Sequence, residues 1–213
     1  MTIELEYPSP AAVRPVGSDN GTVVSEIASS AAAVILDGDR GALLFFAAEA
    51  ASARLLDFAV RHSSGLIHAA MRPNRLDQFR IHDQQVLRSE RGAHDFTVSV
   101  DALGTGTGIS GKDRARTLRM LGSPTAGAED FRRPGHVLPV RCPRNPVDEH
   151  DLVWDKMIRI VECAGFTPVA GACRLVHDSG DVLDEAAACR FADRFGLAVA
   201  TAARRDRAFV GGA

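Results

Sequence analysis

The most informative stretch of the sequence is residues 96–121, which read FTVSVDALGTGTGISGKDRARTLRML. Its first residues are alternating and rich in β-forming types, which predicts a strand over Phe96–Val100. A loop of alternating glycine and threonine follows at Gly104–Ser110. Lys112–Leu121 then has the character of a helix, for which Ser110 is a suitable N-cap. This part of the chain therefore predicts a strand, a glycine-rich loop and a helix in succession.

Outward from this stretch, short apolar runs alternate with amphipathic segments. Further strands are predicted at Ala32–Leu36, Leu43–Phe46, Gly65–Met71, Ala170–Val176 and Leu197–Thr201, and helices at Val23–Ser30, Ala48–Arg61, His150–Ala164 and Leu183–Phe195. The segment Arg132–Pro146 contains four prolines, which exclude a regular helix. Without an internal repeat or a second linker, the pattern predicts an α+β fold, a single-domain mixed β-sheet layered with helices. We expect a flexible N-terminal arm over 1–21, the domain over 22–205 and a C-terminal tail over 206–213.

Composition excludes several classes of protein. The chain has 213 residues, of which 46% are hydrophobic and 24% charged, and this balance excludes general disorder. A formal net charge of −2 provides no basic field for nucleic acid or an anionic membrane. The four cysteines form no CxxC pair, so neither a zinc ribbon nor a thioredoxin-like site is indicated. The acidic start of the chain does not resemble a signal peptide, and we expect a cytoplasmic protein with reduced thiols.

Two segments are candidates for chemistry. The Gly104–Ser110 loop offers backbone N–H groups and hydroxyls that suit a phosphate or carboxylate, although a flexible connection is equally compatible with it. Asp113 and Arg114 add charge beside it, as a site or as a surface ion pair. The turn Arg133-Pro134-Gly135-His136 presents a histidine suited to general acid or base catalysis, or one that is simply part of the surface.

Together these segments carry a resemblance to a known family. Phe96–Asp101, Thr107–Ser110 with Asp113-Arg114, and Arg133–Pro139 resemble 3,4-dihydroxy-2-butanone 4-phosphate synthase, with supporting matches at Arg61–Gly65, Ala164–Pro168 and Asp178–Gly180. The order and spacing agree from about Val34 to Thr201. The resemblance implies a homodimer with active sites at the subunit interface. It also implies conversion of ribulose 5-phosphate to dihydroxybutanone phosphate and formate with the help of magnesium.

Three of the four places that carry this chemistry in the family depart from its pattern. The family's acidic loop is about three residues shorter here, so that Asp39-Arg40 leads straight to Gly41-Ala42; Arg40 remains as a substrate contact, but the metal-binding glutamate has no counterpart. Val153 stands for the metal-binding histidine, beside Trp154, and Arg174 stands for the catalytic glutamate. His136 is retained. We therefore expect no metal and no other cofactor, since magnesium requires hard oxygen ligands.

Several residues leave alternatives open. A slipped alignment brings in His150 or Asp155 as substitute ligands, and Asp37, Asp39 or Glu49 could replace the lost loop carboxylate. His94 or Asp95 could assist His136 in proton transfer, and His68 stands where the family often has cysteine. Trp154 either lines the pocket or packs in the helix core.

The resulting hypothesis is a diverged, metal-independent homologue that binds a small anionic or polyhydroxyl metabolite, in a specialised biosynthetic pathway. His136 is the expected catalytic residue. The expected substrate-binding residues are Arg40, Thr107, Ser110, Asp113, Arg114, Arg133, His150, Trp154 and Arg174. The alternatives are the riboflavin-pathway synthase with a rebuilt metal site and a catalytically dead dimeric binding or regulatory protein.

Overall fold

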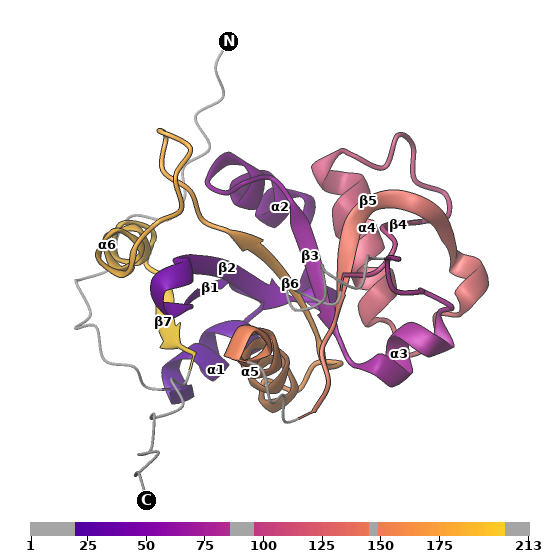
Figure 1. Ribbon diagram of the computed structural model, residues 1–213, viewed down its shortest axis with the longest axis horizontal. Coiled ribbons are helices and arrows are strands. Elements are labelled where there is room, and N and C mark those ends of the chain that lie inside the picture. Colours follow the sequence, from indigo (N-terminus) through magenta and orange to yellow (C-terminus); the bar gives the residue numbers. More distant parts are fainter. Residues whose placement is uncertain (1–19, 86–95, 145–148, 203–213) are drawn as a thin grey trace, which may run out of the picture.

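Seven strands form one mixed sheet in the computed structural model, which describes residues 20–85, 96–144 and 149–202 (Figure 1). From one edge to the other, the strands are β4 (Val100–Ala102), β5 (Phe131–Arg141), β3 (Ile67–Met71), β6 (Val169–Arg174), β2 (Ala42–Ala47), β1 (Ala33–Leu36) and β7 (Ala198–Thr201). The β5–β3 and β1–β7 pairs are parallel, and the other neighbours are antiparallel. This arrangement confirms the predicted α+β fold with a mixed sheet.

Polar side chains cap the starts of three of the described helices. The helices are α1 (Asn20–Ala28), α2 (Ala53–Arg61), α3 (Pro73–Gln78), α4 (Gly111–Gly122), α5 (Glu149–Cys163) and α6 (Glu185–Phe195), with short 3-10 turns η1 (Gly38–Arg40), η2 (Ala48–Ala50) and η4 (Ala128–Asp130). Ser52, Ser110 and Asp184 each accept a backbone N–H from the first turn of α2, α4 and α6. Ser110 is thus the N-cap that the sequence predicts. None of the described helices combines the length and hydropathy needed to cross a bilayer.

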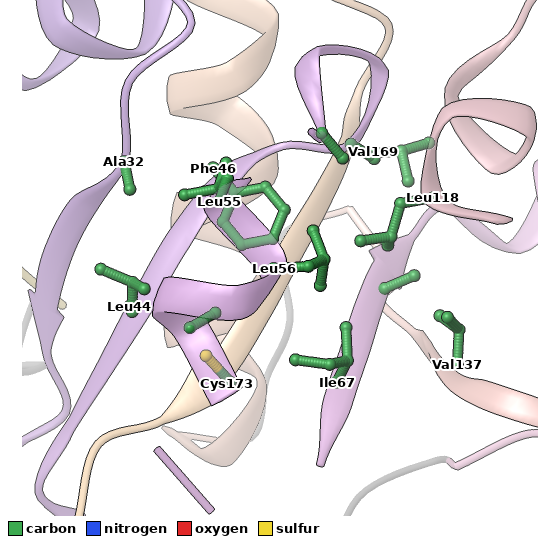
Figure 2. Packing of buried hydrophobic residues seen from close by; sticks show 14 of the residues in the cluster. Ala32, Leu44, Phe46, Leu55, Leu56, Ile67, Leu118, Val137, Val169 and Cys173 are labelled. Atoms are coloured by element: carbon green, nitrogen blue, oxygen red, sulfur yellow. The ribbon is translucent and has the colours of Figure 1, made fainter. Parts of the chain in front are cut away.

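The helices cover both faces of the sheet. Helices α1 and α5 lie side by side on one face, and α2, α4 and α6 contribute to the core on the other (Figure 1). Figure 2 shows part of the second core, in which Leu56 of α2 and Leu118 of α4 lie near Ile67 and Val137 of the sheet. Every residue of β1, β2 and β3 is buried, as expected for strands sandwiched between two helical layers.

Some boundaries differ from those predicted. The helix expected over Ala48–Arg61 is divided, because Ser52 caps a helix that begins only at Ala53. The strand expected over Phe96–Val100 is regular only over Val100–Ala102, while Phe96 and Thr97 make isolated bridges. A register shift against β5 falls between Val100 and Asp101, inside β4. Helix α1 begins at Asn20, inside the expected arm; residues 1–19 and 203–213 lie outside the described residues.

Candidate active site

His136 lies in β5 and is held by Asp101 of the neighbouring strand β4. One Asp101 carboxylate oxygen accepts the backbone N–H of His136 at 2.9 Å, and the other lies 2.8 Å from His136 Nδ1. The Asp101 side chain is 1% exposed, whereas that of His136 is 38% exposed. A carboxylate only accepts hydrogen bonds, so this contact favours a proton on Nδ1 and leaves the Nε2 lone pair of the neutral ring for a substrate.

Two glycines allow this close approach. A Cβ atom on Gly108 would lie 2.1 Å from Asp101 Oδ2 and 2.6 Å from His136 Nδ1, and the φ of Gly108 is +86°. A Cβ atom on Gly135 would lie 2.0 Å from the Val100 carbonyl carbon. Arg132 adds a third contact, since its Nη2 lies 3.3 Å from Asp101 Oδ2. We call Asp101, Gly108 and His136 the histidine corner.

A side-chain carboxylate of the protein holds the glycine-rich loop beside this corner. The Asp113 carboxylate accepts the backbone N–H groups of Gly106 and Gly108 at 3.4 and 3.2 Å. Desolvation raises the pKa of Asp113, but hydrogen bonding by Ser110 and by these two N–H groups outweighs it and leaves the pKa below its ordinary value. Two donors of the predicted phosphate cradle are therefore already occupied. Thr107 and Ser110 are exposed on this loop.

Two arginines expected to bind substrate are engaged in structural contacts. Arg133 donates to the carbonyl oxygens of Phe131, Phe79 and Ala128, which fastens β5 to the α3 end and to η4. Arg114 is buried and donates to the Gly65 carbonyl at 2.9 Å. Burial lowers the pKa of Arg114. These contacts favour a structural role for both residues over the expected binding role.

Arg40 and Arg174 meet at a single carboxylate. Arg40 contacts both oxygens of Asp37, at 2.7 and 3.1 Å, and Arg174 Nη1 lies 3.1 Å from Asp37 Oδ2 and 2.8 Å from the Arg40 carbonyl. The Asp37 side chain is 1% exposed. The shortened loop makes this possible, because it closes as the tight turn η1 and returns through Gly41 at φ +84°. We call Asp37, Arg40 and Arg174 the arginine clasp.

The start of α5 packs into the core. Val153 and Trp154 are 0% and 2% exposed, and the Trp154 ring lies against His68, which is stacked on Phe96. This burial favours the packing interpretation of Trp154 and corrects its expected place at the mouth of a pocket. The reason is that α5 is amphipathic and turns the face that carries Val153 and Trp154 toward the sheet. His68 is buried in the same contact.

The substitute metal ligands are not gathered at one place: Asp39 is exposed, and the others are engaged elsewhere or lie outside the described residues. Asp155 is held by Arg72 at 2.6 Å and by Arg159 at 2.7 Å, and Glu49 accepts the Thr167 N–H. Asp37 lies in the arginine clasp. Within the described ranges, no group of three or more histidine, cysteine, aspartate or glutamate side chains is arranged to hold a metal. His94 and Asp95 lie outside the described residues; His150 is in the first turn of α5, and its side chain also lies outside them.

Sequence reasoning missed the pairing of Asp101 with His136 and that of Asp37 with Arg174, although Asp37 was considered as a replacement for the lost loop carboxylate. Asp101 was visible only as the last residue of the motif before the glycine-rich loop. Neither its 35-residue separation from His136 nor the 137-residue separation of Asp37 from Arg174 leaves a local signal in the sequence.

The fold and the site define a class of protein: a single mixed sheet layered with helices, with an aspartate-held histidine beside a glycine-rich loop at one edge. The family model of 3,4-dihydroxy-2-butanone 4-phosphate synthase matches residues 21–204. The chain belongs to this family, as its resemblance predicts.

Relatives and solved structures agree with this assignment. Riboflavin biosynthesis protein RibBA of Mycobacterium tuberculosis and that of Mycobacterium marinum are each 33% identical over 186 residues, which cover 84% of this chain and 44% of the relative. The chain thus spans less than half the length of these relatives. A crystal structure of 3,4-dihydroxy-2-butanone 4-phosphate synthase in complex with two magnesium ions has a TM-score of 0.78 and 32% identity, covering 85% of this chain and 91% of that one. The synthase of Candida albicans has a TM-score of 0.75 and 27% identity, covering 85% of this chain and 92% of that one.

Proposed function

We propose that this chain is a diverged member of the synthase family that carries out acid/base chemistry on a small anionic or polyhydroxyl metabolite without a bound metal. The observation that carries the proposal is the histidine corner. A half-exposed imidazole fixed by a buried carboxylate is a suitable proton acceptor and donor, since its reactive nitrogen is held at a defined place. A specialised biosynthetic pathway and a cytoplasmic location fit this proposal.

The steps that the chain's own residues support are proton transfers at His136 Nε2. Asp101 holds the opposite ring nitrogen and compensates the positive charge that forms when the imidazole takes up a proton. The exposed donors of Thr107 and Ser110 lie on the loop that Gly108 brings against the corner. A polyhydroxyl compound suits such a site, because each of its carbon-bound hydroxyls both donates and accepts hydrogen bonds.

The residues present do not fit magnesium, the metal named for one of the similar structures. Magnesium takes carboxylate and water oxygens in an octahedral arrangement, and it keeps several of its waters. By the resemblance, the place of the metal-binding histidine carries Val153, which is buried and aliphatic, and the place of the catalytic glutamate carries Arg174, which is cationic and already pairs with Asp37. We therefore propose that no step of the reaction uses a protein-bound magnesium ion.

Activity and metal binding can be tested together. The full chain is incubated with ribulose 5-phosphate, with and without millimolar magnesium, and formate is followed. We expect no formate with either mixture; metal-dependent formation would instead identify the riboflavin-pathway synthase with a rebuilt metal site. Calorimetry with magnesium should show no binding to the unmodified protein or to Val153→His, since a single histidine does not offset the charge of Arg174.

A search for the substrate then uses His136→Ala as its matched control. Panels of sugar phosphates, hydroxy acids and sugars in deuterated water report proton exchange at carbon by NMR. We expect exchange with at least one compound, and its loss in His136→Ala. Exchange that is equal in both proteins would contradict the proposed role of His136 and favour a binding or regulatory protein.

We also propose a homodimer with its active sites at the interface. Leu66 and Ile109 support it, because these apolar side chains, directly before β3 and in the glycine-rich loop, are 50% and 53% exposed. Sedimentation of the unmodified chain should give twice the monomer mass. Leu66→Lys with Ile109→Lys should shift it to the monomer.

A further inference from the structure

The arginine clasp lies on the same face of the sheet as His136. Arg174 pairs with Leu43 in the neighbouring strand, and Leu43 belongs to the core beneath α1 and α5. Val137, next to His136, belongs to the opposite core, so alternation along β5 turns His136 toward the α5 side. Only β3 separates the two strands β5 and β6.

The spacing of these strands sets a minimum length for a ligand that meets both groups. Ser64, just before β3, donates its backbone N–H to the Arg174 carbonyl, and Ile67 in β3 is paired with Val137. Strands β5 and β6 are two inter-strand spacings apart, which is roughly 10 Å. The Arg174 guanidinium reaches from β6 to the connection between β1 and β2, and His136 reaches to Asp101 of β4, so a ligand that meets both groups is longer than this spacing.

The clasp brings two guanidinium groups to one carboxylate. Arg40 and Arg174 both pair with the buried side chain of Asp37. Asp39 lies in the same turn, exposed, and its charge faces solvent instead of the buried carboxylate. The side chains of Arg40 and Arg174 are 33% and 19% exposed, so both are reachable from solvent.

Arg174 also has unused hydrogen-bonding capacity. Both of its contacts to described residues use Nη1, so its Nε and Nη2 donors have no partner among the residues that the structure describes. A guanidinium presents its donors in a planar fork that matches a carboxylate or a phosphate. The pairing with Asp37 fixes the orientation of this fork before a ligand arrives, which reduces the entropic cost of binding.

We propose that Arg174, oriented by Asp37 and assisted by Arg40, binds the carboxylate or phosphate group of the substrate on which His136 acts. The inference rests on the proposed function for the identity of that substrate, but the binding of an anion does not depend on turnover. It also accounts for the two charges that the shortened loop and β6 bring together.

The test is calorimetric titration of the full chain with inorganic phosphate and, separately, with succinate at constant ionic strength. We expect millimolar or tighter binding of at least one probe, and at least a tenfold loss of affinity in Arg174→Gln. The preferred probe identifies the group: phosphate indicates a phosphate ester and succinate a carboxylic acid. Arg61→Gln is the matched control, since Arg61 pairs with Asp57 on the surface of α2 and should leave affinity unchanged.

Two further variants keep the test decisive. Arg174→Lys retains the charge opposite Asp37 but lacks the planar fork, so we expect it to fold and to bind the probes severalfold more weakly than the unmodified chain. It takes the place of Arg174→Gln if that variant fails to fold. His136→Ala should bind both probes like the unmodified chain. Failure of both probes to bind, or equal affinity in Arg174→Gln or Arg174→Lys, would overturn the proposed anion binding by the arginine clasp. Loss of binding in the Arg174 variants without any His136-dependent exchange would support anion binding by the clasp and overturn the proposed function.

Discussion

The histidine corner and the arginine clasp occupy the same face of one sheet but differ in how they relate to the family pattern. The histidine corner keeps the Arg-Pro-Gly-His sequence that carries the family resemblance and places a buried aspartate behind its histidine. The clasp carries Arg174 where the resemblance places the family's catalytic glutamate, and pairs it with Asp37. Under the proposed function, the proton-transfer group is preserved while the group that meets the substrate's charge is changed.

The physical reason lies in the dependence of each group on its surroundings. The proposed role of the imidazole requires only its partner carboxylate and a close-packed loop, which are supplied by β4 and by the glycine-rich loop that follows it. A magnesium site requires several oxygen ligands at once, so the loss of one ligand removes the value of the others. A guanidinium carries its charge and its donors in one side chain, and a single substitution can therefore introduce it.

Asp101→Asn should have the largest effect on activity. With its amide oxygen kept on the His136 N–H, the variant directs an NH₂ group at Nδ1 and Arg132, which favours the wrong tautomer and repels the guanidinium. We expect His136-dependent exchange to fall by about 10²–10⁴-fold with little change in anion binding. Nitrogen NMR of the imidazole should show the proton moving to Nε2; an unchanged tautomer with unchanged exchange would contradict the role of Asp101.

Asp155→Ala should have the largest effect on stability. It removes the carboxylate that pairs with buried Arg72 at 2.6 Å and with Arg159 at 2.7 Å. An uncompensated buried charge typically costs about 3–5 kcal/mol, measured here as the free energy of unfolding in urea. The His136 tautomer should stay as in the unmodified chain. As a control, Asp57→Ala, which breaks the surface pair with Arg61, should cost less than about 1 kcal/mol.

Trp154→Phe separates packing from ligand binding at the start of α5. Because Trp154 is 2% exposed, we expect a loss of about 1–3 kcal/mol in the free energy of unfolding from the smaller ring. Phosphate and succinate affinities should not change. A selective loss of anion binding with unchanged stability would instead place Trp154 in the binding site.

The smallest expected effect concerns His62, which belongs to neither site. Its ring packs against Phe58, Phe191 and Phe195, and burial, followed by the charges of Arg194 and Arg61, lowers its pKa below the ordinary value of 6.5. The unfolded chain then binds a proton at His62 more readily than the folded chain does. The contribution of His62 to the free energy of unfolding is therefore fully present above pH 6.5 and is lost as the pH falls through the lower pKa of the folded state.

Urea unfolding between pH 7.5 and 5 checks this dependence in the unmodified chain and in His62→Gln. The variant should lose part of the decline toward acid pH, while its anion binding at pH 7.5 stays the same. An identical pH slope in the two proteins would assign the decline to other groups.

Much of the fold follows from patterns that are local in the sequence. Apolar runs mark β1 and β2, and Ser110 caps α4 because its side chain accepts a backbone N–H three residues later. Gly196 ends α6 in a left-handed conformation at φ 65°, which glycine adopts without strain. By contrast, the turn expected at Arg133–His136 is wrong, because these residues lie within strand β5.

The sequence by itself predicted most of the helices and strands and the family, but neither α3 nor β5. The tertiary structure decided that Asp101 stands behind His136, that Asp113 fills the glycine-rich loop, and that Trp154 is buried. It also brought Asp37 to Arg174 across 137 positions. Helix caps and turns depend on neighbouring residues, whereas these contacts depend on strand register and helix rotation, which arise only when distant segments pack together.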